Sequence, residues 1–452
     1  MIKYKFAGYT PNDEILAFYA NYTPDCFITT SETEGLPISV VEAMDLGLPI
    51  VVTDVGGMRE LVDGNGLLLP SNPTAEEVAS AIVSIMDCNE DTRNEMKLNG
   101  KKIWSSRFDA VLNAKEFANY IADVCKDGTQ KVVLITERYP FGGEQTFIET
   151  ELREMLKRFD VSLICYNIDN SSGDKECQAS INIDRVLKDQ DGEIHNLEVI
   201  KNSDNWKTGH CVRYFFDYIL DRNIKEERKS IWRTNKKRMI RFWESLKYYS
   251  KAEEFLKNTL LDVIDNCDLS RTVIYTYWHQ PYTLAACLLK ASGRNLKVIT
   301  REHGFDLYDE RVKKSIRQPF REMMDNYLES VIFACKIGKQ YYLDRNHFGC
   351  NDEKYRVHYI GSRHYNDMLN VITNERNTKI IEGGDGQGTS QKPFKIVSCS
   401  ALIPLKRVNL IIDALNVINK TRPSTNIEWI HFGDGELLQP MQTYACVKLG
   451  GQ

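Results

Sequence analysis

Residues 31–57 read SETEGLPISVVEAMDLGLPIVVTDVGG. A polar loop begins this stretch, a helical segment follows at 38–47, and a buried strand followed by two glycines occupies 49–57. This order is typical of a parallel sheet whose strands are joined by helices. Glu34 lies in the loop, Pro37 suits the first helical position, and Glu42 falls about one turn inside the helix.

The alternation of strand and helix continues on both sides of this stretch. Residues 1–125 also contain strand patterns at 2–8, 26–32 and 66–70 and helical patterns at 13–22 and 75–86. A second run, 131–370, begins with the strand KVVLIT, and a third, shorter run occupies 394–452. The sequence therefore predicts an α/β protein with two doubly wound, Rossmann-like domains.

The two ends of the chain predict one shared sheet. Residues 1–125 supply the later strands of a doubly wound order and residues 394–452 supply the first two, so each piece lacks the other's half. We expect Ile2–Phe6 to lie in the same sheet as Ile396–Ser400, with Gln452 near Met1. The chain order is then circularly permuted; the alternative is that the ends pair between two chains.

The second domain covers 131–370, with a polar helical insertion at 168–270. The glycine-rich stretch 371–393 has the composition of a linker to the final segment. Between residues 222 and 243, RNIKEERKSIWRTNKKRMIRFW interleaves basic and aromatic side chains. A basic helix with aromatic anchors can contact an anionic membrane surface, and a solvated helical face is the alternative.

Composition limits the partners and the location. The 452 residues are 42 % hydrophobic and 27 % charged with a formal net charge of −5, which excludes a general attraction to nucleic acid. No apolar run reaches the roughly 18 residues of a spanning helix, and the first residues lack a signal-peptide core. These features predict a cytoplasmic protein, peripheral at the inner face of the membrane if the basic helix binds lipid.

The glutamates of the first stretch suit a ligand with hydroxyl groups and negative charge. A loop and helix start offer free backbone N–H groups to an anion, and carboxylates accept hydrogens from sugar hydroxyls. The alternative is a surface loop followed by a solvated helical glutamate.

The phrase E-G-L-P-x-S-x-x-E-A-M at 34–44, followed by G-x-P-I-V-x-T-D-V-G-G at 47–57, resembles the donor-site signature of retaining glycosyltransferases of family 4. That family has the GT-B fold of two Rossmann-like domains facing a cleft. YPFGGEQTFIETE at 139–151 and REHGFDLY at 301–308 resemble its glycine and histidine loops. SCSALIPLKRV at 398–408 and HFGDGEL at 431–437 resemble the opening of its donor-binding domain, so all the motifs are present in rotated order.

The resemblance implies roles for individual residues of the donor side. Glu42 would hold the ribose of a nucleotide-diphosphate sugar, and Glu34 would face the transferred sugar. Gly35 and Leu36 would give backbone contacts. Lys406 would neutralise the diphosphate, which gains charge as it leaves.

Other implied roles concern charge and backbone approach. The family often carries an arginine where this chain has Ala401, so Arg407 or another cation would complete the diphosphate site. Gly433 would keep the nucleotide cleft open and Gly143 would bring a helix start to the ligand. His303 would contact the reacting sugar or the acceptor.

Together these features predict a retaining, hexosyl-type glycosyltransferase that moves a sugar from a nucleotide-diphosphate donor to a saccharide or lipid-linked acceptor in surface polysaccharide or glycoconjugate synthesis. No cofactor and no metal is expected, because the sequence has no cluster at metal-ligand spacing. Two alternatives remain: a nucleotide-sugar 2-epimerase of the same fold, and a permuted, non-catalytic nucleotide-sugar-binding protein.

Overall fold

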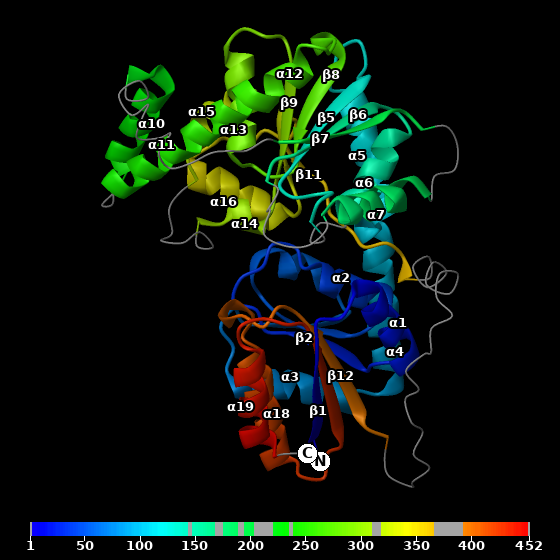
Figure 1. The fold of residues 1–452 in the computed structure, drawn as a ribbon. Helices are drawn as coiled ribbons and strands as arrows, with labels where there is room; N and C mark the ends of the chain where they lie inside the picture. Colours follow the sequence, from blue (N-terminus) through cyan, green and yellow to red (C-terminus); the bar gives the residue numbers. More distant parts are fainter. Residues whose placement is uncertain are drawn as a thin grey trace. The chain divides into compact units, whose positions relative to one another are not determined.

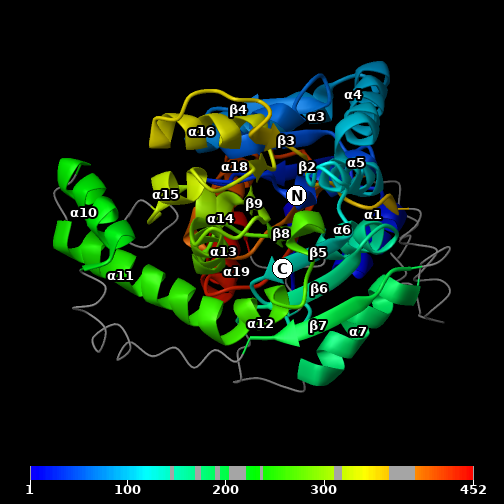
Figure 2. The same cartoon turned by 90° about the horizontal axis from the view of Figure 1, so that it is seen from above.

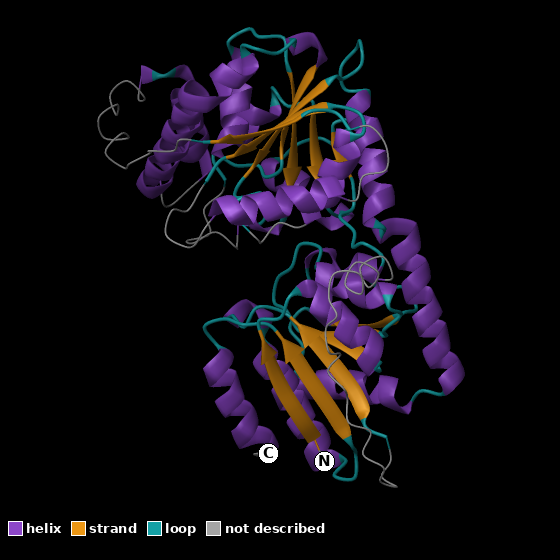
Figure 3. Cartoon of the chain, turned by 45° about the vertical axis from the view of Figure 1, so that its right-hand side comes forward, coloured by secondary structure: helices purple, strands orange, loops and turns teal. Residues whose placement is uncertain are grey.

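The computed structural model describes residues 2–142, 147–167, 175–188, 194–202, 220–234, 238–309, 318–365 and 392–450. The chain divides into two compact units, one of Met1–Ala110 and Ile360–Gln452 and the other of Val111–Tyr359. Each unit is built on a parallel β-sheet with helices on both faces (Figure 3). The predicted α/β fold with two Rossmann-like sheets is therefore confirmed.

The sheet of the first unit draws strands from both segments of the chain. Its order is β1 (Ile2–Gly8), β13 (Ile427–Phe432), β12 (Phe394–Cys399), β2 (Cys26–Thr29), β3 (Ile50–Thr53) and β4 (Gly66–Leu69). All pairings are parallel, and Ile427 lies opposite both Ile2 and Phe394. The prediction that 2–6 and 396–400 share one sheet is confirmed, whereas Met1 and Gln452 lie outside the described residues.

Helices cover both faces of this sheet (Figure 1). They are α1 (Asn12–Tyr22), α2 (Ile38–Asp45), α3 (Ala75–Asp87), α4 (Glu90–Ile103), α18 (Val408–Thr421) and α19 (Leu438–Leu449). Ile411, Leu415 and Ile418 recur along one stripe of α18 and pack in one core with Ile396 and Trp429 of the sheet. The buried stripe explains why α18 forms on the sheet rather than in solvent.

The second unit contains a seven-stranded parallel sheet. Its order is β11 (Tyr355–Val357), β10 (Ser330–Phe333), β9 (Lys297–Glu302), β8 (Thr272–Thr276), β5 (Lys131–Thr136), β6 (Asp160–Cys165) and β7 (Leu197–Lys201). Figure 2 shows the part of this order from β9 to β7. The two edge strands were not predicted. In particular, β7 lies within 168–270, which we interpreted as a largely helical insertion, and its side chains are mostly exposed.

The helices of this unit are α5 (Ala110–Ala122), α6 (Phe147–Leu156), α7 (Lys175–Lys188), α10 (Arg222–Thr234), α11 (Arg238–Phe255), α12 (Leu261–Ile264), α13 (Pro281–Ala291), α14 (Gly304–Leu307), α15 (Arg321–Asp325) and α16 (Lys336–Asn346). Phe117 and Ile121 of α5 are buried in a core with β5, β6 and β8. The N-terminal segment of the first unit thus ends at Ala110, whereas we expected this segment to extend to 125.

Residues 366–391, which include most of the predicted linker, lie outside the described residues. In the part of the chain that the structure describes, no helix is long and apolar enough to cross a membrane.

Candidate functional site

The loop after β2 is held in place by a hydrogen bond within the loop and by hydrogen bonds from β3 and from the segment that follows β3. Ser31 Oγ donates to Glu34 Oε1 at 2.7 Å, and Thr53 Oγ1 of β3 donates to the Ser31 carbonyl oxygen at 2.6 Å. The Gly57 N–H donates to the Gly35 carbonyl oxygen at 2.8 Å. The Glu34 side chain is thereby placed at the carboxyl edge of the sheet, where ligands bind in open α/β folds.

Gly56 explains how this loop approaches the segment after β3. Its φ is +51°, and a Cβ at this position would lie 1.8 Å from the carbonyl oxygen of Glu34. A side chain there would push the glutamate loop away, so the glycine is needed for the close approach of two backbones.

Lys406 reaches the same edge from the other segment of the chain. It ends a 3₁₀ turn, Pro404–Lys406, after β12, and its Nζ forms an ion pair with Glu34 Oε1. The partners are 372 positions apart in the sequence. The parallel pairing of β12 with β2 brings the two residues together.

Glu42 lies inside α2 and is buried. The structure begins α2 at Ile38, with Pro37 as the N-cap rather than the first helical residue. Asn12, at the start of α1, donates from Nδ2 to Glu42 Oε1 at 2.9 Å. Burial raises the pKa of Glu42 to about 7, although the Asn12 hydrogen bond opposes this shift. Sequence reasoning did not find Asn12.

Arg407 differs from the expectation for a diphosphate ligand. Its Nε donates to the Thr30 carbonyl oxygen at 2.7 Å, and Nη2 donates to the carbonyl oxygens of Ser31 and Ser71, both at 2.8 Å. Nη1 donates to Asn72 Oδ1 at 3.0 Å. The guanidinium thus ties the start of α18 to two loops of the N-terminal segment, which leaves it poorly placed to bind phosphate.

The structure also places the remaining predicted residues of the first unit. Gly433 has φ +135°, and a Cβ there would lie 1.9 Å from the Ser400 carbonyl oxygen. Its N–H donates to the Gly8 carbonyl oxygen at 2.9 Å, so it joins the loops after three neighbouring strands. Leu36 is partly buried in the glutamate loop.

His303 belongs to the second unit and follows β9 directly. Its ring stacks on Tyr277, with centroids 4.9 Å apart and an angle of 28° between the planes, and lies 5.3 Å from Trp278. Burial, aided by the nearby Arg301 guanidinium, lowers the pKa of His303 to about 3. The imidazole is therefore neutral at physiological pH. Gly143, the other residue predicted for this side, lies outside the described residues.

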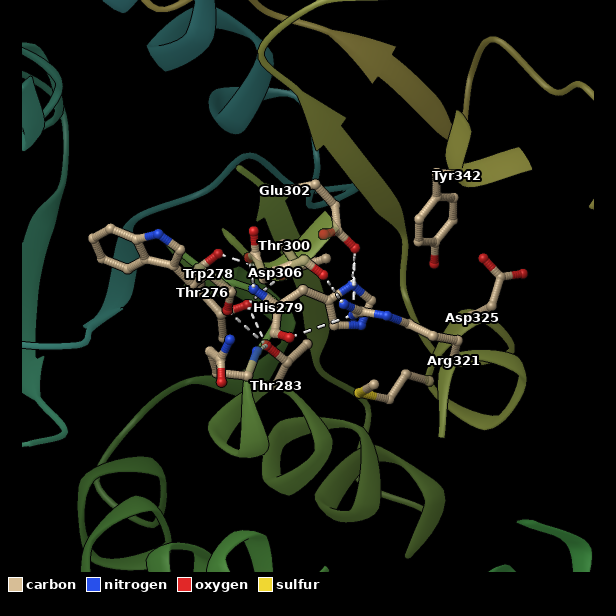
Figure 4. Close-up of polar contacts among 12 residues, drawn as sticks. Thr276, Trp278, His279, Thr283, Thr300, Glu302, Asp306, Arg321, Asp325 and Tyr342 are labelled. Carbon is tan, nitrogen blue, oxygen red and sulfur yellow. Dashed lines mark hydrogen bonds and ion pairs between the residues drawn. The ribbon is translucent and has the colours of Figure 1, made fainter. Parts of the chain in front are cut away.

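Asp306 was not singled out from the sequence, although it belongs to the REHGFDLY motif. It is fully buried, and its carboxylate accepts the backbone N–H of His279 at 2.7 Å (Figure 4). The other carboxylate oxygen accepts the backbone N–H of His303 at 2.7 Å. Among the described residues, no group of three or more His, Cys, Asp or Glu side chains is arranged to hold a metal ion.

Parts of this chain are similar to known proteins. Residues 2–103 match the family described as glycosyl transferases group 1. The O-antigen biosynthesis glycosyltransferase WbnH of Escherichia coli is 36 % identical over 89 residues, which cover 20 % of this chain and 26 % of that protein.

Two further relatives show similar partial matches. The putative teichuronic acid biosynthesis glycosyltransferase TuaC of Bacillus subtilis is 29 % identical over 119 residues, 26 % of this chain and 30 % of that protein. The putative colanic acid biosynthesis glycosyltransferase WcaL of Salmonella typhimurium is 31 % identical over 91 residues, 19 % of this chain and 22 % of that protein. The chain thus spans between about a fifth and a third of the length of these relatives. The family match at 2–103 falls within the first unit, and the two parallel sheets are consistent with two Rossmann-like domains.

Proposed function

We propose that this chain is a retaining, family 4 glycosyltransferase that moves a hexosyl-type sugar from a nucleotide-diphosphate donor to a saccharide or lipid-linked acceptor. The observation that carries the proposal is the ion pair of Glu34 and Lys406 at one sheet edge. Glu34 lies in the segment 2–103 that matches group 1 glycosyltransferases, and Lys406 comes from the C-terminal segment of the same unit. The names of the relatives, which refer to O-antigen, teichuronic acid and colanic acid biosynthesis, favour surface polysaccharide synthesis.

In this proposal the charged groups of the first unit bind the nucleotide-diphosphate donor. Lys406 carries three N–H donors, so it can contact a diphosphate in addition to Glu34 and stabilise the charge that develops as the nucleotide leaves. The N-terminus of α2 has no side-chain cap, which leaves backbone N–H groups and the positive end of the helix dipole for an anion. Glu42 would accept ribose hydroxyls, and Glu34 would face the transferred sugar.

We also propose that residues 2–110 and 392–450 work as one donor-binding domain in permuted order. Neither segment buries its apolar faces alone, because β12 and β13 lie between β1 and β2. His303 of the second unit would contact the reacting sugar or the acceptor, as a neutral hydrogen-bonding group rather than a cation.

A membrane-bound acceptor would fit the basic segment 222–243. Trp232, Met239 and Ile240 are exposed on α10 and α11, close in sequence to many lysines and arginines. Such a surface favours peripheral contact with the anionic inner face of a membrane.

A thermal-shift screen of UDP-, GDP- and ADP-sugars, followed by hydrolysis and transfer assays on the hits, tests the proposal. We expect one nucleotide class to raise the melting temperature and the Glu42→Ala variant to lose that shift. Release of a free epimer of the donor sugar without an acceptor would instead identify an isomerase. Stabilisation by no nucleotide sugar would refute the donor-site assignment.

A further inference from the structure

Four buried polar side chains join the two loops that follow β8 and β9 in the second unit (Figure 4). They are His279, Glu302, Asp306 and Arg321, and none is more than 3 % exposed. None of them can touch a substrate directly, so their role must act through the loops that they hold.

Asp306 connects the backbones of the two loops. One carboxylate oxygen accepts the N–H of His279 and the other accepts the N–H of His303, each at 2.7 Å. Burial raises the pKa of Asp306 to about 6, against the opposing influence of Arg321 and of these hydrogen bonds. The carboxyl group is therefore mostly ionised at neutral pH and can accept from both loops at once.

Arg321, at the start of α15, supplies the complementary donors. Its Nη2 donates to the carbonyl oxygen of Asp306 at 2.7 Å, and its Nη1 lies 3.4 Å from the carbonyl oxygen of His279. Nη1 also lies 3.3 Å from Glu302 Oε1, which is hydrogen-bonded to His279 Nδ1 at 2.6 Å. Burial alone would lower the pKa of the guanidinium, but the Glu302 carboxylate raises it above the ordinary value.

Stability alone does not account for this arrangement. Removing charges from water is costly, and a well-packed apolar cluster of similar volume is often at least as stable as a buried ionic one. A carboxylate and a planar guanidinium differ from such a cluster because they fix the direction of several backbone groups. Here those groups set the position of His303 relative to Tyr277, on which its ring stacks.

We propose that Asp306 and Arg321 are positioning residues that hold His303 for sugar transfer. The transfer step rests on the proposed function, but the effect on the His303 side chain does not. Asp306→Asn leaves one oxygen for two N–H donors, and Arg321→Lys keeps the charge but removes the fork that reaches both loops.

Histidine NMR tests the positioning without any assay of activity. In the wild type, the ring resonance of His303, assigned by its loss in His303→Gln, should not titrate between about pH 5 and 8. In Asp306→Asn and Arg321→Lys the loops separate, so the ring should become hydrated and titrate near the ordinary value of about 6.5. A His303 ring that stays untitrated in both variants would overturn the proposal.

Kinetics tests the functional consequence once a donor is known. Each variant should lower turnover about 10- to 100-fold while the donor KM stays within about twofold, because misplacing a reacting group affects the chemical step more than binding. The control variant is Arg294→Lys. Arg294 forms an ion pair of 2.5 Å with Asp265, away from the two loops, so the same change there should leave turnover and donor KM unchanged.

The remaining outcomes also decide the question. A titrating His303 with unchanged turnover would show that the positioning has no catalytic role and would overturn the proposal. Loss of cooperative melting in both variants would assign the cluster to stability and would overturn it as well. If no donor supports transfer, the proposed function fails, and the NMR result still supports or overturns the positioning of His303 by Asp306 and Arg321.

Discussion

Replacing Glu42 should weaken donor binding, and the size of the loss can be derived from the hydrogen bonds that its carboxylate can still accept. The carboxylate is buried and accepts a hydrogen bond from Asn12 at Oε1, and in the proposed site its remaining lone pairs would accept ribose hydroxyls. One hydrogen bond to a charged group contributes about 1.5 to 3 kcal/mol, which corresponds to an increase in Kd of about 10- to 150-fold in Glu42→Ala. Glu42→Gln keeps the oxygen that Asn12 contacts but removes the charge, so it should show most of this loss.

The pH dependence gives a sharper test of the same residue. Burial raises the pKa of Glu42 to about 7, so the free protein holds a proton there below neutral pH. Ribose hydroxyls prefer the ionised form, and donor binding should therefore strengthen as the pH rises through 7, with release of a proton. If only the carboxylate binds, affinity should increase about tenfold between about pH 6 and 8.

Isothermal titration calorimetry with an intact nucleotide sugar measures this dependence, since its diphosphate has no proton that titrates in this range. Glu42→Gln should bind weakly at every pH. The exposed Glu76 of α3 offers a matched control, and Glu76→Gln should keep both the affinity and the slope. An equal pH slope in the wild type and in Glu42→Gln would refute the reasoning.

The remaining predictions concern turnover, metal and membrane. Glu34→Ala and His303→Ala should each depress transfer more than nucleotide affinity, and steady-state kinetics with either variant fully active would remove that residue from the site. Treatment with EDTA should leave activity intact, because the proposed stabilisation of the leaving group uses a lysine and helix dipoles; complete loss restored by manganese would contradict this. Sedimentation with anionic liposomes should be sensitive to salt and should fall when Lys236, Lys237 and Arg238 are changed to Glu, whereas equal sedimentation of the variant would retire membrane contact.

Local sequence patterns were sufficient to predict most of the fold. Buried strands such as Lys131–Thr136 and helices with one apolar stripe, such as Val408–Thr421, carry their periodicity within a few residues. Each end of the chain supplies only part of one doubly wound strand order. This observation also predicted that β12 and β13 would pair with the N-terminal strands. The edge strand Leu197–Lys201 was missed because it is only five residues long and most of its side chains are exposed, so its apolar pattern is too short to stand out from the polar segment around it.

The motifs singled out candidate residues for a donor site, but they did not show how these residues contact one another. Glu34 and Lys406 were both singled out, and their ion pair depends on the register of β12 against β2. The sequence shows that residue 407 is a cation but not which groups it contacts, and Arg407 was therefore expected to bind phosphate. The structure shows that carbonyl oxygens of distant loops already accept its donors.

The buried network of the second unit depends entirely on tertiary structure. Nothing in the local sequence around Arg321 marks it as a partner of the loops at 277–280 and 303–306, since its contacts span up to 42 positions. Most helices and strands are encoded by the spacing of apolar residues along a few turns, so the sequence alone predicted most of the secondary structure. A hydrogen bond between distant residues exists only after strands and helices have packed, so the partners of Asp306, Glu42 and Arg407 were decided by the tertiary structure.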